Sequence, residues 1–270
     1  MAFSPFTEAI DAELDLVEGA ATVARIEYPG LRAARVRARL DELAAPLARL
    51  GLARLPALAQ ARALADHLHV VNGFRGNADN YFDPSNSFIN VVLERRLGIP
   101  ITLAVVYVEV ARRVGVSARG VGFPGHFLVR VDDRRDTVVL DPFFGGEVLD
   151  RVALGNLLQR VAPRMTLRDE MLDPVSVKQL VARMLMNLRG IYAARADSGR
   201  LLAVLDHLID LMPEAADEVR DRGFLCARLG APRAAVADLR RYVDALPHAG
   251  DVAEVRRAIE RLEASAAPLH

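Results

Sequence analysis

The chain has 270 residues, of which 52% are hydrophobic and 26% charged, a balance typical of a soluble globular protein with a sizeable core. Lysine plus arginine and aspartate plus glutamate both number 35, so the net charge is zero and offers no electrostatic case for binding nucleic acid or an anionic membrane. The single cysteine excludes an internal disulfide framework. The first residues show no secretory pattern and no apolar run is long enough to span a bilayer, so we expect a cytoplasmic protein without a membrane segment.

The first third of the chain predicts helices. Ser4 followed by Pro5 is typical of a capped helix start. Residues 33–50 carry apolar side chains at spacings of three and four, which predicts a helix with one buried face and a kink at Pro46. Residues 58–71 predict a third helix.

A loop rich in glycine, asparagine and aspartate is expected over residues 72–86. Binding residues often lie on loops that a rigid scaffold supports, so Arg75, Tyr81, Phe82 and Asn86 are candidate binding residues. The alternative is a simple connector, in which Asn86 caps the helix expected over residues 88–97.

An interior helix is predicted next, because residues 103–114 are apolar on nearly all sides. Pro100 suits its first turn. Thr102 lies at its N-terminus, where unpaired backbone N–H groups and the helix dipole favour an anion or a nucleophile of lowered pKa.

A β-hairpin follows, with strands expected at residues 126–132 and 136–140. If the pairing is centred on the polar turn, the numbers of opposed residues sum to about 267, and directly opposed residues have Cβ atoms about 5 Å apart. His126 then faces Asp141 at the open end, and a slip of one residue would bury the charged face. The register therefore predicts a hydrogen-bonded His126–Asp141 pair.

Three segments together resemble the SirB-type branch of the transglutaminase-like superfamily: NSFINVVLERRLGIPITLAVVYVEVARRVG, GFPGHFLVRV and LDPFFGG. The likeness is close over roughly residues 80–150. It implies an α+β fold: a transglutaminase-like (papain-like) core of helices packed on a small antiparallel sheet, followed by an all-α tetratricopeptide-like region. It also implies a catalytic pattern of cysteine, histidine and aspartate, in which His126 would be the base and Asp141 the residue that orients it.

The sequence departs from that pattern at the nucleophile. The position expected for the catalytic cysteine falls near residues 100–102, which are Pro, Ile and Thr. Cys226 is far along the chain in a helical segment, where a lone cysteine is most often a small buried hydrophobic residue. Thr102 is the positional candidate for a nucleophile, but a hydroxyl lacks the readily formed anion of a thiol.

Two domains are expected, 1–173 and 174–270, because residues 162–174 form a polar boundary. Before it, residues 147–150 predict a short strand and 151–161 a helix. After it, five helices are expected over residues 176–194, 200–212, 215–229, 232–246 and 251–264. The motif Leu-Met-Pro-Glu-Ala at 211–215 recurs as Ala-Leu-Pro-His-Ala at 245–249, an offset of about 34 residues that is typical of the tetratricopeptide repeat. Such helix pairs commonly bind peptides, and a helical cap over the core is the alternative.

Three functional hypotheses follow. The first, which the missing thiol favours, is a non-catalytic protein- or peptide-binding regulatory module. The second is an acyl-transfer or amide-hydrolysing enzyme that uses Thr102, His126 and Asp141, and the third is a scaffold that binds partners through its C-terminal helices alone. No phosphate-binding loop, zinc spacing or nucleotide fingerprint is present, so we expect no cofactor and no metal. We expect a protein or peptide partner, and neither nucleic acid nor membrane as a ligand.

Overall fold

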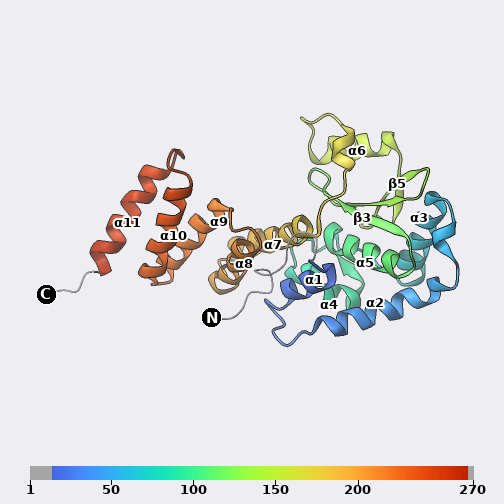
Figure 1. Cartoon of the computed structure of the whole chain (residues 1–270), viewed down its shortest axis with the longest axis horizontal. Helices are drawn as coiled ribbons and strands as arrows, with labels where there is room; N and C mark the ends of the chain where they lie inside the picture. Colours follow the sequence, from blue (N-terminus) through green and yellow to red (C-terminus); the bar gives the residue numbers. More distant parts are fainter. Residues whose placement is uncertain (1–13, 267–270) are drawn as a thin grey trace. The chain divides into compact units, whose positions relative to one another are not determined.

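The computed structural model describes residues 14–266 and divides the chain into two compact units (Figure 1). The first unit spans Ile10–Met184, and the second contains the helices from Leu185 onward. The division falls inside the helix α7 (Val177–Ala194), whose first half packs with the first unit. The polar segment that predicts a boundary at 173/174 lies just before this helix.

Three helices open the described part of the first unit. Helix α1 (Leu16–Ala24) is capped by Asp15, whose carboxylate accepts the Glu18 N–H at 2.8 Å. Helix α2 (Ala33–Ala48) continues through Pro46 and ends two residues later. Helix α3 (Ala57–Ala65) runs on into a π-helical turn over Asp66–Val71. The helix start expected at Ser4–Pro5 lies outside the described residues.

The expected loop over residues 72–86 is largely irregular but contains two short elements. Strand β1 (Arg75–Gly76) pairs in parallel with β2 (Leu97–Gly98), and a 3₁₀ turn spans Pro84–Ser87. Helix α4 (Ile89–Arg95) follows. The β1–β2 pairing ties the loop to the chain just before the central helix.

The central helix α5 (Pro100–Arg113) is buried over most of its length, as its composition predicts. It packs against a four-stranded antiparallel sheet of order β3-β4-β5-β6. The strands are β3 (Ser117–Val121), β4 (Leu128–Asp132), β5 (Thr137–Asp141) and β6 (Glu147–Leu149). The sequence patterns did not predict strand β3.

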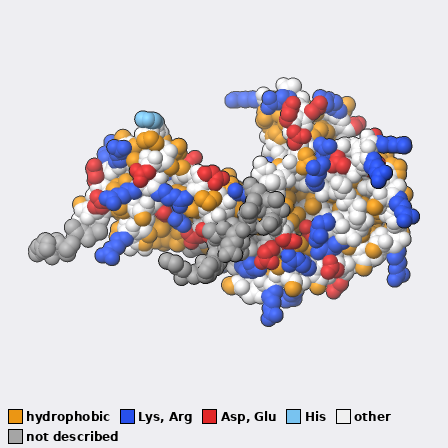
Figure 2. Space-filling model, in the orientation of Figure 1, with side chains coloured by type: hydrophobic (Ala, Val, Ile, Leu, Met, Phe, Trp, Pro, Cys, Tyr) orange, Lys and Arg blue, Asp and Glu red, His pale blue; other side chains and the backbone are white. Residues whose placement is uncertain are grey.

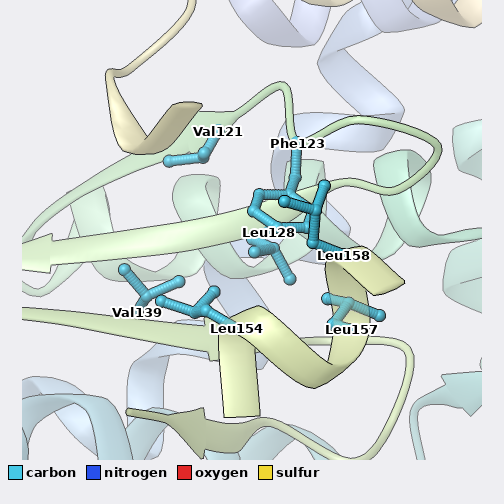
Figure 3. Close-up of a cluster of buried hydrophobic side chains, with 7 residues drawn as sticks. All are labelled: Val121, Phe123, Leu128, Val139, Leu154, Leu157 and Leu158. Carbon is cyan, nitrogen blue, oxygen red and sulfur yellow. The ribbon is translucent and has the colours of Figure 1, made fainter. Parts of the chain in front are cut away.

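The other face of the sheet is covered by α6 (Arg151–Val161), which begins and ends where the sequence predicts. Figure 3 shows strand side chains meeting leucines of this helix in a buried cluster. The cluster consists of Val121, Phe123, Leu128, Val139, Leu154, Leu157 and Leu158. Both faces of the sheet are therefore buried, and the unit has three layers.

The hairpin register differs from the expectation. Val129 pairs with Leu140 and Val131 with Val138, so the paired residue numbers sum to 269 rather than 267. The side chain of Asp133 stabilises the turn: its carboxylate accepts the N–H groups of Arg135 and Asp136 at 2.6 and 2.8 Å. An offset of two preserves the alternation of faces, so the apolar set still points inward.

The second unit consists of helix pairs. Helices α8 (Ser198–Leu211), α9 (Ala216–Arg228), α10 (Pro232–Ala245) and α11 (Val252–Ala266) follow the last turns of α7, and their bounds agree with the expected ranges to within two residues. The first residues of α8 and α10 are 34 positions apart. Helix α9 approaches α10 closely at Gly223, where an added Cβ would lie 2.9 Å from the Leu239 side chain. The expected α+β core followed by an all-α repeat region is confirmed.

The charged side chains of both units are mixed in sign. In the view of Figure 2, lysine and arginine alternate with aspartate and glutamate on the surface of each unit. Within residues 14–266, no helix combines the length and the apolar character that crossing a bilayer requires.

Candidate functional site

The site is built around His126, which lies in the bend between β3 and β4. Its backbone N–H donates to the Phe123 carbonyl at 3.0 Å, which closes the bend. Its ring Nε2 lies 2.8 Å from Oδ2 of Asp141, at the end of β5, and the two side chains are 9% and 2% exposed. An ionised carboxylate only accepts hydrogen bonds, so Nε2 carries the proton in this contact. The other ring nitrogen, Nδ1, does not take part in it. Among the described residues, no group forms a hydrogen bond with Nδ1.

Asp141 also fixes the loop that follows β5. Its Oδ1 accepts the N–H of Phe143 at 2.9 Å and of Phe144 at 3.4 Å, and its backbone carbonyl accepts the Gly146 N–H at 2.7 Å. The same carboxylate thus orients the imidazole and the two phenylalanines beside it. Gly146 has φ +76°, and a Cβ there would meet Ala65 and the hydroxyl of Tyr107 from beneath the loop.

Aromatic rings surround the imidazole. The ring of Phe144 lies nearly parallel to that of His126 at a centroid distance of 6.2 Å, and Phe143 presents its edge at 6.1 Å. Tyr81 packs edge-on against Phe143 at 6.0 Å. Phe144 is 54% exposed and Tyr81 is 38% exposed. We call His126, Tyr81, Phe143 and Phe144 the aromatic surface.

The candidates from the preceding loop lie at different distances from this surface. Tyr81 belongs to it, and the exposed Phe82 contacts Tyr81 edge-on at 5.3 Å. Arg75 is exposed on β1, next to Gly76, which is packed against the Phe143 ring. These contacts bring residues 75–82 of the loop to the Phe143 ring, which lies beside His126.

Asn86, which the sequence made a candidate binding residue, lies in the interior of the protein. It is fully buried, and its amide nitrogen donates to the carbonyls of Asn80 and Tyr81 at 2.8 and 3.2 Å. Its Oδ1 accepts from the Asn77 side chain at 2.9 Å. All of these bonds are internal to the loop, so Asn86 positions Tyr81 and does not itself face a ligand.

Thr102 is likewise not joined to the histidine. Its fully buried hydroxyl donates to the Asn86 carbonyl at 2.7 Å and accepts the Ile99 N–H at 3.2 Å. Within the described chain, none of its hydrogen bonds reaches His126. A helix N-terminus leaves backbone N–H groups unsatisfied, and the Thr102 hydroxyl satisfies the one of Ile99, while its own proton goes to the Asn86 carbonyl 16 positions away. The expected Thr102–His126–Asp141 arrangement is therefore not assembled.

Arg183 of α7 completes the site. Its Nη2 donates to the carbonyls of Phe123 and His126 at 3.1 and 2.9 Å, and its guanidinium carbon lies 5.6 Å from the centre of the Phe127 ring. Burial lowers the pKa of Arg183. Burial also raises the pKa of the Tyr81 hydroxyl, an effect that the charge of Arg183 opposes.

Three residues of the site, Arg183, Phe143 and Phe144, were not predicted from the sequence. Arg183 gives no local signal, because its partner His126 is 57 positions away. The two phenylalanines do give one: they are consecutive large aromatic residues in a turn, directly after the aspartate.

The chemistry available is that of an oriented imidazole without a thiol. Cys226 belongs to the second unit, where burial, followed by the charge of Asp238, raises the pKa of its thiol. Over residues 14–266, no cluster of three or more histidine, cysteine or acidic side chains is arranged to hold a metal ion.

These features define a class of protein, a transglutaminase-like core joined to tetratricopeptide-like repeats. The core has a central helix packed on an antiparallel sheet and a histidine–aspartate pair at the end of that sheet, and an array of helix pairs follows it. The transglutaminase-like superfamily matches residues 34–186, and the tetratricopeptide repeat matches residues 188–260. The first match covers more than half of the chain, which therefore belongs to the transglutaminase-like superfamily.

Bacterial relatives match the chain over most of its length. A UPF0162 protein of Xylella fastidiosa (strain Temecula1) is 37% identical over 254 residues, 91% of this chain and 89% of the relative. A UPF0162 protein of Pseudomonas aeruginosa is 30% identical over 253 residues, covering 94% and 92%. Protein SirB1 of Salmonella typhimurium is 26% identical over 187 residues, 69% of each chain, so the SirB-type resemblance is confirmed. No solved structure matches the chain.

Proposed function

We propose that this protein is a non-catalytic transglutaminase-like module that binds a protein or peptide partner at the aromatic surface. The observation that carries the proposal is the use of the Thr102 hydroxyl, which holds the Ile99 N–H and the Asn86 carbonyl in the interior. The histidine that would activate a nucleophile instead lies beside the buried ring of Phe143 and the exposed ring of Phe144.

Exposed aromatic side chains support binding. A phenylalanine that leaves more than half of its surface in water, as Phe144 does, loses free energy that a partner could restore by covering it. Its backbone is held by Asp141, so little conformational entropy would be lost on binding. The helix pairs of the second unit offer a further surface of a kind that commonly binds peptides.

The test is affinity capture from a bacterial lysate with full-length wild-type, Phe144→Ala and His126→Ala proteins as baits, quantified by mass spectrometry. Leu50→Ala is the matched control, because Leu50 is an exposed apolar residue near the end of α2. We expect a partner that Leu50→Ala retains and Phe144→Ala loses. Capture that none of the three substitutions changes would overturn the proposal and favour the scaffold that binds through its C-terminal helices.

The oriented imidazole favours one alternative, an acyl-transfer or amide-hydrolysing enzyme. Asp141 holds His126 through Nε2 and leaves Nδ1 for a proton transfer. Hydrolysis of activated esters by wild type, His126→Ala and Thr102→Val separates the two functions. Turnover above the rate of His126→Ala that Thr102→Val abolishes would establish the enzyme, with circular dichroism confirming that both variants fold.

A further inference from the structure

Arg183 carries a charge without a counter-ion. Both of its side-chain hydrogen bonds leave from Nη2, and both end on neutral backbone carbonyls. No carboxylate in residues 14–266 forms an ion pair with it. By contrast, Arg113, also in the first unit, pairs with Glu109 at 2.5 Å and with Asp41 at 2.6 Å. A partly buried cation without a partner is destabilised, and an incoming anion would remove that cost.

The unpaired nitrogens of Arg183 lie next to the aromatic surface. The Nη1 atom lies beside Gly122, where an added Cβ would be 3.3 Å from it, so the glycine lets the guanidinium approach the backbone closely. The carbonyl that Nη2 of Arg183 holds at 2.9 Å belongs to His126, whose ring lies beside Phe143 and Phe144. The charge of Arg183 also lowers the pKa of the Tyr81 hydroxyl, against the larger effect of burial. Tyr81 in turn contacts Phe143, which contacts Phe144 at 5.2 Å. The exposed rings of Tyr81 and Phe144 are thus joined through the buried ring of Phe143, in a strip beside the residue whose carbonyl Arg183 holds.

We propose that this strip binds a segment of a partner protein in which an acidic side chain neighbours an apolar one. The carboxylate would accept hydrogen bonds from Nε and Nη1 of Arg183 and from the Tyr81 hydroxyl, and the apolar side chain would cover Phe144. The proposal rests on the proposed function and names the chemistry of its ligand. A single guanidinium among a phenol, an imidazole and phenyl rings matches the single charge of a carboxylate rather than the nearly double charge of a phosphate.

The matched probes are the peptides acetyl-Ala-Phe-Glu-Ala-amide and acetyl-Ala-Phe-Gln-Ala-amide, which differ only in the carboxylate. Titrations of full-length protein are followed by NMR, with the ring resonances of His126 reporting the location. We expect the glutamate peptide to bind about tenfold more tightly or better, because hydrogen bonds to an ionised carboxylate are stronger than those to the neutral amide of glutamine. Phe144→Ala should weaken both peptides and leave their ratio unchanged.

Variants of the arginine decide the outcome. Arg183→Gln keeps a donor for the two carbonyls but removes the charge, and it should abolish the preference for glutamate. Arg183→Lys should retain part of it. Arg134→Gln, at the exposed tip of the hairpin, is the control and should behave as wild type. Thermal melts establish that each variant folds.

Equal binding of the two peptides, a preference that survives in Arg183→Gln, or no shift of His126 by the glutamate peptide at millimolar concentration would each overturn the inference. The same variants keep the two proposals apart. If affinity capture depends on Phe144 but is unchanged in Arg183→Gln, the binding function stands and the acidic ligand is wrong. If capture depends on neither residue, both proposals fail.

Discussion

The imidazole of His126 and the carboxylate of Asp141 meet at 2.8 Å although the two residues are not paired across the hairpin. Strand β4 begins at Leu128, so His126 lies in the preceding bend, where Arg183 holds its carbonyl. The contact is therefore made between a bend and a strand end, and it is not itself one of the pairs in the ladder of β4 and β5.

Replacing Asp141 should destabilise the first unit. Asp141→Ala leaves the His126 Nε2–H and the Phe143 N–H without acceptors in a buried position, which we expect to cost about 1 to 3 kcal/mol. Asp141→Asn keeps a side-chain oxygen for the Phe143 N–H and should cost less. Urea denaturation measures both, and an Ala variant as stable as wild type would contradict the expected role.

Two glycines should respond oppositely to alanine. At Gly146, with φ +76°, the new Cβ would lie 2.5 Å from Cβ of Ala65 and 2.8 Å from the Tyr107 hydroxyl. We expect Gly146→Ala to lower the free energy of unfolding by about 1 to 3 kcal/mol through backbone strain. The steric clash should lower it further. Gly155 in α6 has open space around its Cβ position, so Gly155→Ala should stabilise by about 0.5 to 1 kcal/mol. Thermal and chemical denaturation compare the two, and similar effects would refute this assignment.

Asp132 should make stability depend on pH in the acid range. Burial alone would raise the pKa of this carboxyl, but hydrogen bonds from Arg119, Arg130 and Thr137 lower it below its ordinary value of 3.8. A pKa depressed in the folded state contributes stability above the unfolded value and loses it as the pH falls through the folded value. Wild type should thus exceed Asp132→Asn in stability near neutral pH, and the difference should vanish in acid. Denaturation over a pH series tests this, and a difference independent of pH would contradict it.

Cys226 should react slowly with alkylating reagents. Its thiol is buried, and burial together with the charge of Asp238 raises its pKa above the ordinary 9.0. Because the thiolate is the reactive form, iodoacetamide at pH 8 should modify the folded protein far more slowly than the same protein in urea. Mass spectrometry follows the reaction over time. Rapid modification of the folded chain would show a reactive thiol and reopen the question of a nucleophile.

Most of the helices could be predicted from local patterns in the sequence. The repeat helices α8 to α11 and the helix α6 are recognisable because apolar spacing, proline and glycine signals act over a few residues. Strand β3 could not be recognised in this way: Ser-Ala-Arg-Gly-Val has no alternation, and it is a strand because it pairs with β4 and packs on α5.

The pairing of His126 with Asp141 was also accessible from the sequence, through hairpin parity and through the family motif. The exact register was not, because the turn that the Asp133 side chain holds is centred one residue later than expected, so each residue pairs two positions from its expected partner. Parity survives such an offset, since side chains alternate with a period of two. The contact between His126 and Asp141 was therefore predicted correctly, although the strand pairing used to predict it differs from the observed one.

The sequence by itself determined the class of fold, the helix pairs and the identity of the histidine and aspartate, because these depend on short-range patterns. Only the tertiary structure decided what Thr102, Asn86 and Arg183 do. Thr102 finds its acceptor 16 positions away, and Arg183 reaches the His126 carbonyl across 57. Hydrogen bonds over such separations depend on how the helices and the loop pack, and packing gives a buried hydroxyl, amide or guanidinium its partners.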